Sequence, residues 1–278
     1  MEKGVQLKRL VLLLALLAQI LSPAVGWGEQ TTFIMAGSGT NLPIIRILAQ
    51  AFTKKYPNFS IEVPASIGST SGIRAAADDA IAIGLVSREL KENEKSLGLK
   101  VITFAHTPLI IAVHPSVAEE NITDAEILDI YRGTKRSWKN GREVIVLTRE
   151  PGESNIEVME KRVPRFREVY AESQRAKRWT TLHRDREMNE TLAKTPLAIG
   201  FSDLGQLTIE GHKIKPLKVN GVAPTLKNVQ EGRYPLVKPL IFVFHQEKLP
   251  PAAREFLAFV RSQEGMKIMR DNGYLPET

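Results

Sequence analysis

Residues 32–43, which read TFIMAGSGTNLP, contain the pattern that decides the fold. The apolar run 32–35 is typical of a buried β-strand, and it leads into the small polar loop Gly37–Asn41. Pro43 then stands where a first helical turn tolerates proline, and the apolar residues after it recur at helical spacing. The segment therefore predicts a strand, a polar loop and a helix that begins at the loop.

Two further stretches repeat this small, polar, glycine-containing loop. Gly68–Gly72 reads GSTSG after a predicted strand over 60–63, and Arg149–Asn155 reads REPGESN after a predicted strand over 143–148. A helix start has unpaired N–H groups and about half a positive charge, which makes it a natural site for an anion. Three such loops and one arginine predict a pocket around a small oxyanion, and hence a binding protein rather than a catalyst.

The remaining segments alternate between strand and helix patterns, which indicates βαβ units and a parallel sheet. We expect helices over 44–52, 73–80, 123–131 and 252–269, and strands over 82–86, 101–104, 109–113, 197–201, 214–219 and 239–244. Two of these strands, 109–113 and 239–244, are expected to cross between two lobes. No proline- or glycine-rich linker divides the chain, so joined lobes are expected rather than separate domains.

The N-terminus has the pattern of a cleavable signal peptide. Three basic residues precede an apolar run over 10–21, and residues 22–24, which read SPA, supply the small side chains that a signal peptidase prefers. The run is shorter than the roughly 20 residues that span a bilayer, although an uncleaved anchor is the alternative. We expect residues 1–26 to be removed, by cleavage after Ala24 or Gly26, and the mature protein to lie in the periplasm.

The composition is that of a mildly basic chain without cysteine. The formal charge is +7, and it falls to +5 when residues 1–26 are removed with their three basic residues and one acidic residue. This charge favours anionic ligands but is not a nucleic-acid signature, and we expect no nucleic-acid partner. The basic stretch 161–186 has interleaved acidic residues, which predicts a solvated helical face; a partner-docking face is the alternative. Without cysteine the chain has neither a disulfide nor a lipid-attachment site.

Several segments, taken in order, resemble the phosphate-binding proteins of ABC transporters, which are soluble receptors with the type II periplasmic binding fold. Residues 37–43 and 67–72 are similar to the family's two glycine–serine loops. Further similar segments are 131–133 with Trp138, 198–203, and the tail from 252–257 through 273–276. The resemblance implies an α/β fold of two lobes, with mixed sheets, helices on both faces and a ligand cleft between the lobes.

The resemblance also implies a domain organisation and a function. Lobe 1 would comprise residues 27–108 and 233–278, and lobe 2 residues 109–232. The protein would capture a small oxyanion, phosphate in the first place, for the membrane permease of an ABC importer, as a monomer and without a cofactor. A sensing module that presents its liganded state to another membrane partner is the first alternative. A hydrolase is a remote one, because the chain has no catalytic motif and its five histidines are scattered.

Ligand-binding residues follow from the same resemblance. Asn41 and the backbone of Leu42 match positions that bond phosphate oxygens from the first loop, and Ser69 matches the serine of the second loop. Arg149 matches an arginine that forks onto two oxygens, a geometry that lysine cannot reproduce, and Gly152 matches a loop glycine. The predicted ligand-binding set is Ser38, Gly39, Thr40, Asn41, Leu42, Ser69, Thr70, Ser71, Ser87, Arg149, Gly152, Glu153, Ser154 and Asn155. Helix capping is the alternative role for the serines and asparagines, and a surface ion pair is the alternative for the arginine.

Two positions depart from the family's pattern. Ser87 stands where the family usually has an aspartate that accepts a hydrogen bond from protonated phosphate and repels sulfate, and Glu153 falls on a ligand-binding serine. An ionised carboxylate beside a dianion costs energy unless it shares a proton or points away. Glu153 therefore faces solvent, or replaces the missing aspartate as the acceptor for a protonated oxyanion, or the ligand is not phosphate. Our working hypothesis is the second, because one carboxylate disappears as another appears on the facing loop.

Overall fold

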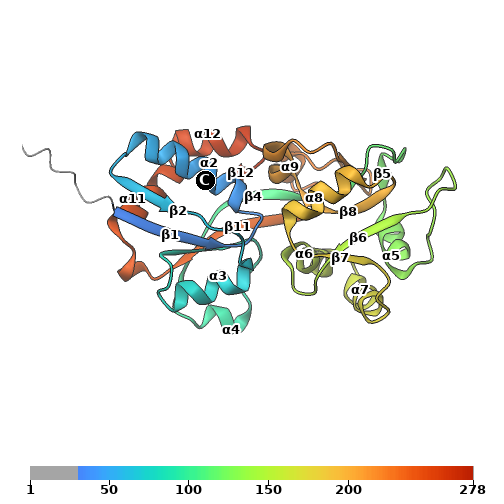
Figure 1. The fold of residues 1–278 in the computed structure, drawn as a ribbon, viewed down its shortest axis with the longest axis horizontal. Helices are drawn as coiled ribbons and strands as arrows, with labels where there is room; N and C mark the ends of the chain where they lie inside the picture. Colours follow the sequence, from blue (N-terminus) through green and yellow to red (C-terminus); the bar gives the residue numbers. More distant parts are fainter. Residues whose placement is uncertain (1–30, 278) are drawn as a thin grey trace, which may run out of the picture. The chain divides into compact units, whose positions relative to one another are not determined.

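The computed structural model describes residues 31–277, and the predicted signal peptide lies outside them (Figure 1). The strands are β1 (Thr31–Gly37), β2 (Phe59–Glu62), β3 (Ile83–Val86), β4 (Lys100–Val113), β5 (Asn121–Ile122), β6 (Ile145–Arg149), β7 (Thr180–Leu182), β8 (Ala198–Asp203), β9 (Lys215–Pro216), β10 (Lys218–Val219), β11 (Val237–Phe244) and β12 (Leu275–Pro276). The main path of the large sheet has the order β2–β1–β3–β11–β4–β8–β6–β7, while β12 and β9 also pair with β4. The sheet is mixed: β1 is parallel to β2 and β3, whereas β11 is antiparallel to both β3 and β4.

The helices lie on both faces of this sheet. They are α2 (Leu42–Lys55), α3 (Gly68–Ala77), α4 (Glu92–Lys95), α5 (Asp124–Arg132), α6 (Ser154–Arg162), α7 (Phe166–Arg175), α8 (Asp185–Lys194), α9 (Leu204–Glu210), α10 (Leu226–Gln230), α11 (Pro251–Val260) and α12 (Gln263–Asp271), with one 3-10 turn, η1 (Gln246–Lys248). In the left half of Figure 1, α2 (blue) and α12 (red) lie above the strands and α3 lies below them. None of the helices within residues 31–277 combines the length and apolar character that a bilayer crossing requires.

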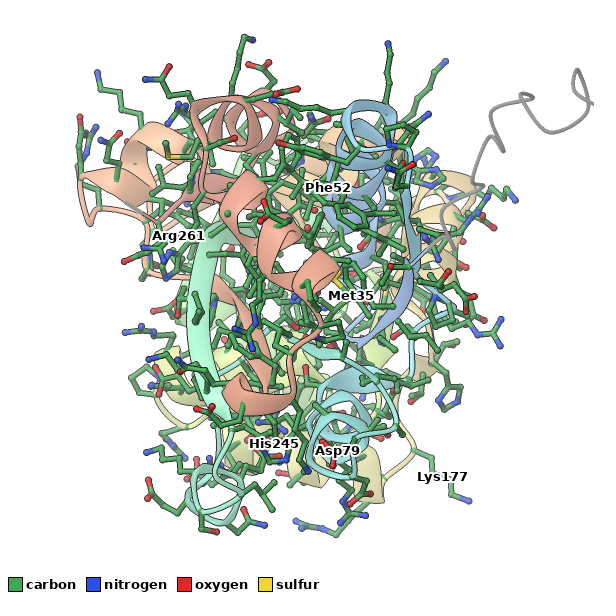
Figure 2. The ribbon with its side chains drawn as sticks, turned by 90° about the vertical axis from the view of Figure 1, so that its left-hand side faces the viewer. Met35, Phe52, Asp79, Lys177, His245 and Arg261 are labelled. Atoms are coloured by element: carbon green, nitrogen blue, oxygen red, sulfur yellow. The ribbon has the colours of Figure 1, made fainter. Side chains whose placement is uncertain are left out.

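Two large apolar cores define two lobes. The buried residues of the first core all lie in 33–105 and 240–274, and Figure 2 shows Met35 and Phe52 within it. The second core draws only on residues 109–236 and lies around Tyr131 of α5, Phe166 of α7 and Phe201 of β8. Smaller clusters under α3 and α8 cover the opposite faces of the two lobes. The two-lobed α/β fold with helices on both faces is therefore confirmed.

The structure corrects four predicted elements. Residues 101–104 and 109–113 belong to one strand, β4, because the segment between them stays paired with β11 instead of turning. The predicted helix 252–269 is divided into α11 and α12, where Ser262 Oγ accepts a hydrogen bond from Gly265 N. Gly68–Gly72 is not a loop before a helix but the first turns of α3 itself. The predicted strand 214–219 is two short strands, β9 and β10.

Helix α5 has local signals at both of its ends. Thr123 caps α5 by accepting from Glu126 N, and Glu126 in turn accepts from Thr123 N, which completes a capping box. Gly133 ends the same helix in the left-handed region, at φ 77°, which glycine adopts without strain. These features are local in the chain, which is why the residue pattern predicts them.

Candidate functional site

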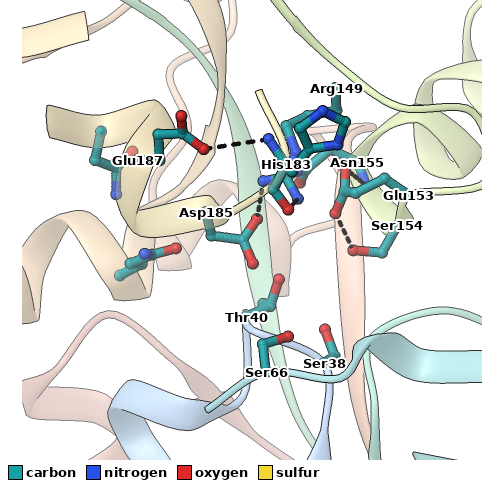
Figure 3. A network of polar contacts seen from close by, with 12 residues as sticks. Ser38, Thr40, Ser66, Arg149, Glu153, Ser154, Asn155, His183, Asp185 and Glu187 are labelled. Atoms are coloured by element: carbon teal, nitrogen blue, oxygen red, sulfur yellow. Dashed lines mark hydrogen bonds and ion pairs between the residues drawn. The ribbon is translucent and has the colours of Figure 1, made fainter. Parts of the chain in front are cut away.

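Helices from both lobes begin around one cavity. Helices α2 and α3 start at the carboxyl ends of strands in the first lobe, and α6 starts where β6 ends in the second. The cavity between these starts has a volume of about 350 Å³ and is lined largely by polar side chains of both lobes (Figure 3). Unpaired N–H groups at helix starts and the helix dipoles make this arrangement favourable for an anion.

The predicted ligand-binding residues fall into two groups. Those that line the cavity are Ser38, Gly39, Ser69, Thr70, Arg149, Gly152, Glu153 and Ser154. Buried away from its lining are Thr40, Asn41, Leu42, Ser87 and Asn155. Ser71 is exposed and does not line it. The structure thus brings the three predicted loops together, while several of their residues take supporting positions.

Ser87 ties the two loops of the first lobe together. Its Oγ lies 2.5 Å from Ser38 Oγ, and its backbone N donates to Ser69 Oγ at 3.3 Å. Gly37 allows the first loop to approach β3, because a Cβ on it would lie 2.0 Å from the carbonyl oxygen of Leu85. The position at which the family usually has an aspartate is therefore fully buried and is used to hold two loops in register.

Arg149 projects from the end of β6 and is almost completely buried. Its Nη1 donates to Asp185 Oδ1 at 2.6 Å, and its Nη2 donates to the carbonyl oxygen of His183 at 3.0 Å. Burial alone would lower the pKa of Arg149, but the carboxylates of Asp185, Glu153 and Glu150 outweigh it and raise the pKa. The guanidinium is therefore a fixed positive charge, and its two terminal nitrogens are already hydrogen-bonded to Asp185 and His183.

Glu153 caps the start of α6 with its own side chain. Its Oε2 accepts from Asn155 N, and its Oε1 accepts from Ser154 Oγ, both at 2.8 Å. A carboxylate at this place compensates the helix dipole and satisfies an otherwise unpaired N–H group. The side chain is half-buried and lines the cavity, so it does not simply face solvent. The anion position at α6 is occupied by a carboxylate of the chain.

Asp185 is a site residue that the sequence pattern did not indicate. It is the first residue of α8, and Figure 3 shows its carboxylate pointing from the second lobe towards Ser38 and Ser66 of the first. A Cβ on Gly39 would lie 2.1 Å from Asp185 Oδ2, so glycine is needed for this approach. His183, Arg184 and Asp185 of the basic stretch 161–186 line the cavity, while His183 and Arg184 remain exposed to solvent.

The placement of Asp185 follows from the sheet. Strand β7 pairs in parallel with β6, and Leu182 stands beside Arg149, so both strands end at the cavity. The stretch 180–187, TTLHRDRE, is a fourth strand followed by a helix start with acidic residues. That pattern could have indicated a fourth strand and helix start at the cavity, but the surrounding basic residues led us to interpret the stretch as a solvated helical face.

Lys238 is a second residue that the sequence pattern did not indicate. It lies in β11 and is fully buried, although its neighbours along the strand, VKPLIFVF, are mainly apolar. Its Nζ donates to Thr40 Oγ1 at 2.5 Å and to Asn155 Oδ1 at 2.8 Å. A charged residue in an otherwise buried strand was the signal, because such a residue needs partners.

Ion pairs beside the cavity also join the lobes. Arg88 Nε lies 3.0 Å from Glu157 Oε2, and Lys91 Nζ lies 2.9 Å from Glu157 Oε1. Arg88 also forms a buried pair with Glu94 at 2.6 Å and donates to Thr70 Oγ1. Within residues 31–277, no group of three or more His, Cys, Asp or Glu side chains is placed to hold a metal ion.

Comparisons with known proteins agree with this architecture. The phosphate-binding protein PstS of Bacillus subtilis (strain 168) is 27% identical over 250 residues, which cover 88% of this chain and 80% of that protein. PstS of Borreliella burgdorferi is 23% identical over 274 residues, covering 96% and 98% of the two chains. A substrate-binding protein from Clostridium perfringens, assigned to a phosphate ABC transporter and solved with bound phosphate, superposes with a TM-score of 0.81 at 26% identity, covering 89% of this chain and all of that one. The family described as the PBP superfamily domain matches residues 24–264, and the chain belongs to this family.

Proposed function

We propose that this protein is a periplasmic solute-binding protein that captures inorganic phosphate, or a similar oxyanion, for the permease of an ABC importer. The observation that carries the proposal is the convergence of α2, α3, α6 and Arg149 on one cavity of about 350 Å³. The relatives named as phosphate-binding proteins, and the related structure with bound phosphate, favour this ligand. The proposed role is binding by a monomer without a cofactor, not catalysis.

The two cores support the proposed lobes. We assign residues 27–108 and 237–278 to lobe 1 and residues 109–236 to lobe 2, which moves the second expected boundary from 232/233 to 236/237. Removal of residues 1–26 belongs to the same proposal. Tyr234 and Leu236 pack in the second core, so we place the return crossing of the chain after Leu236. Residues 105–109 of β4 form the other crossing.

In the proposed complex, the ligand contacts both lobes. Lobe 1 supplies Ser38, Ser69 and Thr70 with the starts of α2 and α3, and lobe 2 supplies Arg149 and Ser154. Ser87 Oγ, Asn155 Oδ1 and the side-chain amide nitrogen of Asn41 already have partners in the protein and hold the loops behind these contacts, whereas Asn41 Oδ1 has no partner among residues 31–277. Their proposed role is support of the binding loops.

Two carboxylates line the same cavity and have different proposed roles. Asp185 is bonded to Arg149, so the ligand takes its place on the guanidinium. Glu153 stays on the start of α6 and accepts a hydrogen bond from a protonated oxyanion, which favours phosphate over sulfate. This role for Glu153 rests on its position at the cavity wall.

A binding measurement tests the proposal. Isothermal titration with phosphate, sulfate and molybdate is combined with thermal unfolding, because a ligand at about 100 times its Kd adds about 2.7 kcal/mol of stability. Arg149→Lys keeps the charge but loses the two-pronged geometry, so phosphate affinity should fall; Arg167→Lys, at an exposed arginine outside the cavity, is the matched control. No stabilisation by any of the oxyanions would refute the proposal.

A further inference from the structure

A fully buried lysine lies directly behind the cavity. Lys238 stands opposite Thr107 of β4, where β11 leaves the second lobe and enters the first. Its side chain has 0% exposure, which is rare for lysine because an ammonium group loses its hydration on burial. Such a residue is retained only where the protein supplies partners for it.

The two oxygens that accept from Lys238 belong to different lobes. Thr40 precedes the start of α2 in the first lobe, whereas Asn155 lies in the first turn of α6 in the second. Lys238 Nζ reaches both, at 2.5 Å from Thr40 Oγ1 and 2.8 Å from Asn155 Oδ1. One ammonium group therefore holds the starts of two helices that begin at the cavity.

Neither of the two residues is free to move away from this position. The carbonyl oxygen of Thr40 accepts from Tyr274 OH at 3.4 Å, and Asn155 N donates to the carboxylate of Glu153. Asp203 is a buried carboxyl near Lys238 that caps α9 by accepting from Gln206 N at 2.8 Å. Lys238 is thus part of a buried polar layer beneath the cavity, and its two direct acceptors both lie in binding loops.

We propose that Lys238 is a positioning residue for anion binding, because it sets the separation of the α2 and α6 starts and places a fixed positive charge behind them. The inference rests on the proposed function and deepens it. It explains why Thr40 and Asn155 lie in binding loops while their side chains point away from the cavity lining. The ligand that benefits is an oxyanion that contacts the first loop of lobe 1 and the Arg149–Asn155 loop of lobe 2 at once.

The test compares two buried residues of the same strand. Lys238→Met keeps the length of the side chain but removes its charge and both hydrogen bonds. Leu240→Ala, two residues further along β11, creates a cavity in the first core and removes no hydrogen bond to Thr40 or Asn155, because a leucine side chain has no donor. Phosphate affinity is measured by titration at a temperature at which each variant is folded, as judged by circular dichroism.

We expect Lys238→Met to weaken phosphate binding about tenfold or more, the scale of hydrogen bonds to a charged group. Leu240→Ala should lower the melting temperature and leave the phosphate Kd within about twofold, since a core cavity acts on stability and not on the loops. Wild-type affinity in Lys238→Met would overturn the inference and leave the proposed function intact. An equal loss of affinity in Leu240→Ala would overturn it as well, because any destabilisation would then suffice.

Two further measurements cover the remaining outcomes. If Lys238→Met does not fold, two variants of Thr40 replace it: Thr40→Val removes the hydroxyl that accepts from Lys238, and Thr40→Ser keeps that hydroxyl. Weaker phosphate binding in Thr40→Val alone supports the inference. Equal phosphate binding in the two variants overturns the inference. If wild-type protein binds no phosphate, the proposed function fails, and backbone amide NMR of the ligand-free protein decides the inference. Amide shifts at both Thr40 and Asn155 in Lys238→Met, absent in Leu240→Ala, support a positioning role; unchanged shifts refute it.

Discussion

Replacing Asp185 by asparagine should strengthen oxyanion binding. The carboxylate holds Arg149 by a 2.6 Å bond, and the two side chains are only 13% and 4% exposed, so solvent screens the pair little. An incoming oxyanion must displace this carboxylate before it can occupy the same N–H group. Asp185→Asn keeps the shape and an acceptor oxygen but replaces the ion pair by a hydrogen bond from the Arg149 guanidinium to a neutral oxygen.

The expected gain can be worked out from this one contact. Loss of the acceptor's charge should weaken the contact that holds Arg149 by about 1.4 kcal/mol, within the range of hydrogen bonds to charged groups, which corresponds to about a tenfold lower Kd. The gain should apply to phosphate and sulfate alike, because it arises from the release of Arg149 and not from a contact with the ligand's proton.

Isothermal titration of wild type and Asp185→Asn with both anions is the assay. Asp124→Asn is the matched control, since Asp124 is likewise the first residue of a helix, α5, but does not line the cavity. An unchanged Kd would refute displacement of Asp185. Weaker phosphate binding with unchanged sulfate binding would also refute it, and would assign the acceptor role to Asp185 instead of Glu153.

Three other substitutions have defined outcomes. Glu153→Gln should reduce the preference for phosphate over sulfate measured by titration; an equal preference in both proteins would contradict the role of Glu153 as acceptor. Arg149→Lys should weaken phosphate binding by about tenfold or more, because one prong of the fork is lost, while the thermal stability of the ligand-free protein serves as the control. For Asp203, burial raises the pKa from 3.8 to about 7, so the folded protein keeps a proton that the unfolded chain has lost in this range. The free energy of unfolding should therefore fall by up to about 4 kcal/mol as the pH rises from about 4 to about 7, and urea unfolding of Asp203→Asn should not show this fall.

Local features of the fold were predictable from the sequence because they depend on neighbouring residues. The apolar spacing of α2, the capping box at Thr123 and the left-handed Gly133 are all contained within one helix or its ends. Strand β4 was not predictable as one element, since residues 105–108 are held extended by pairing with β11 and β12, both more than a hundred residues later. The division between α11 and α12 likewise depends on the close approach of Gly265 to the end of α11.

For the site, the sequence by itself determined the chemistry of the three loops, the presence of one arginine among them and the family to which they are similar. Only the tertiary structure decided which of these groups line the cavity and which lie behind it. It also brought Asp185 to Arg149 and Lys238 to Thr40 and Asn155, pairs that lie 36, 198 and 83 residues apart. The physical reason is that strand register and the two crossing strands set these contacts, and neither is encoded in the residues that meet.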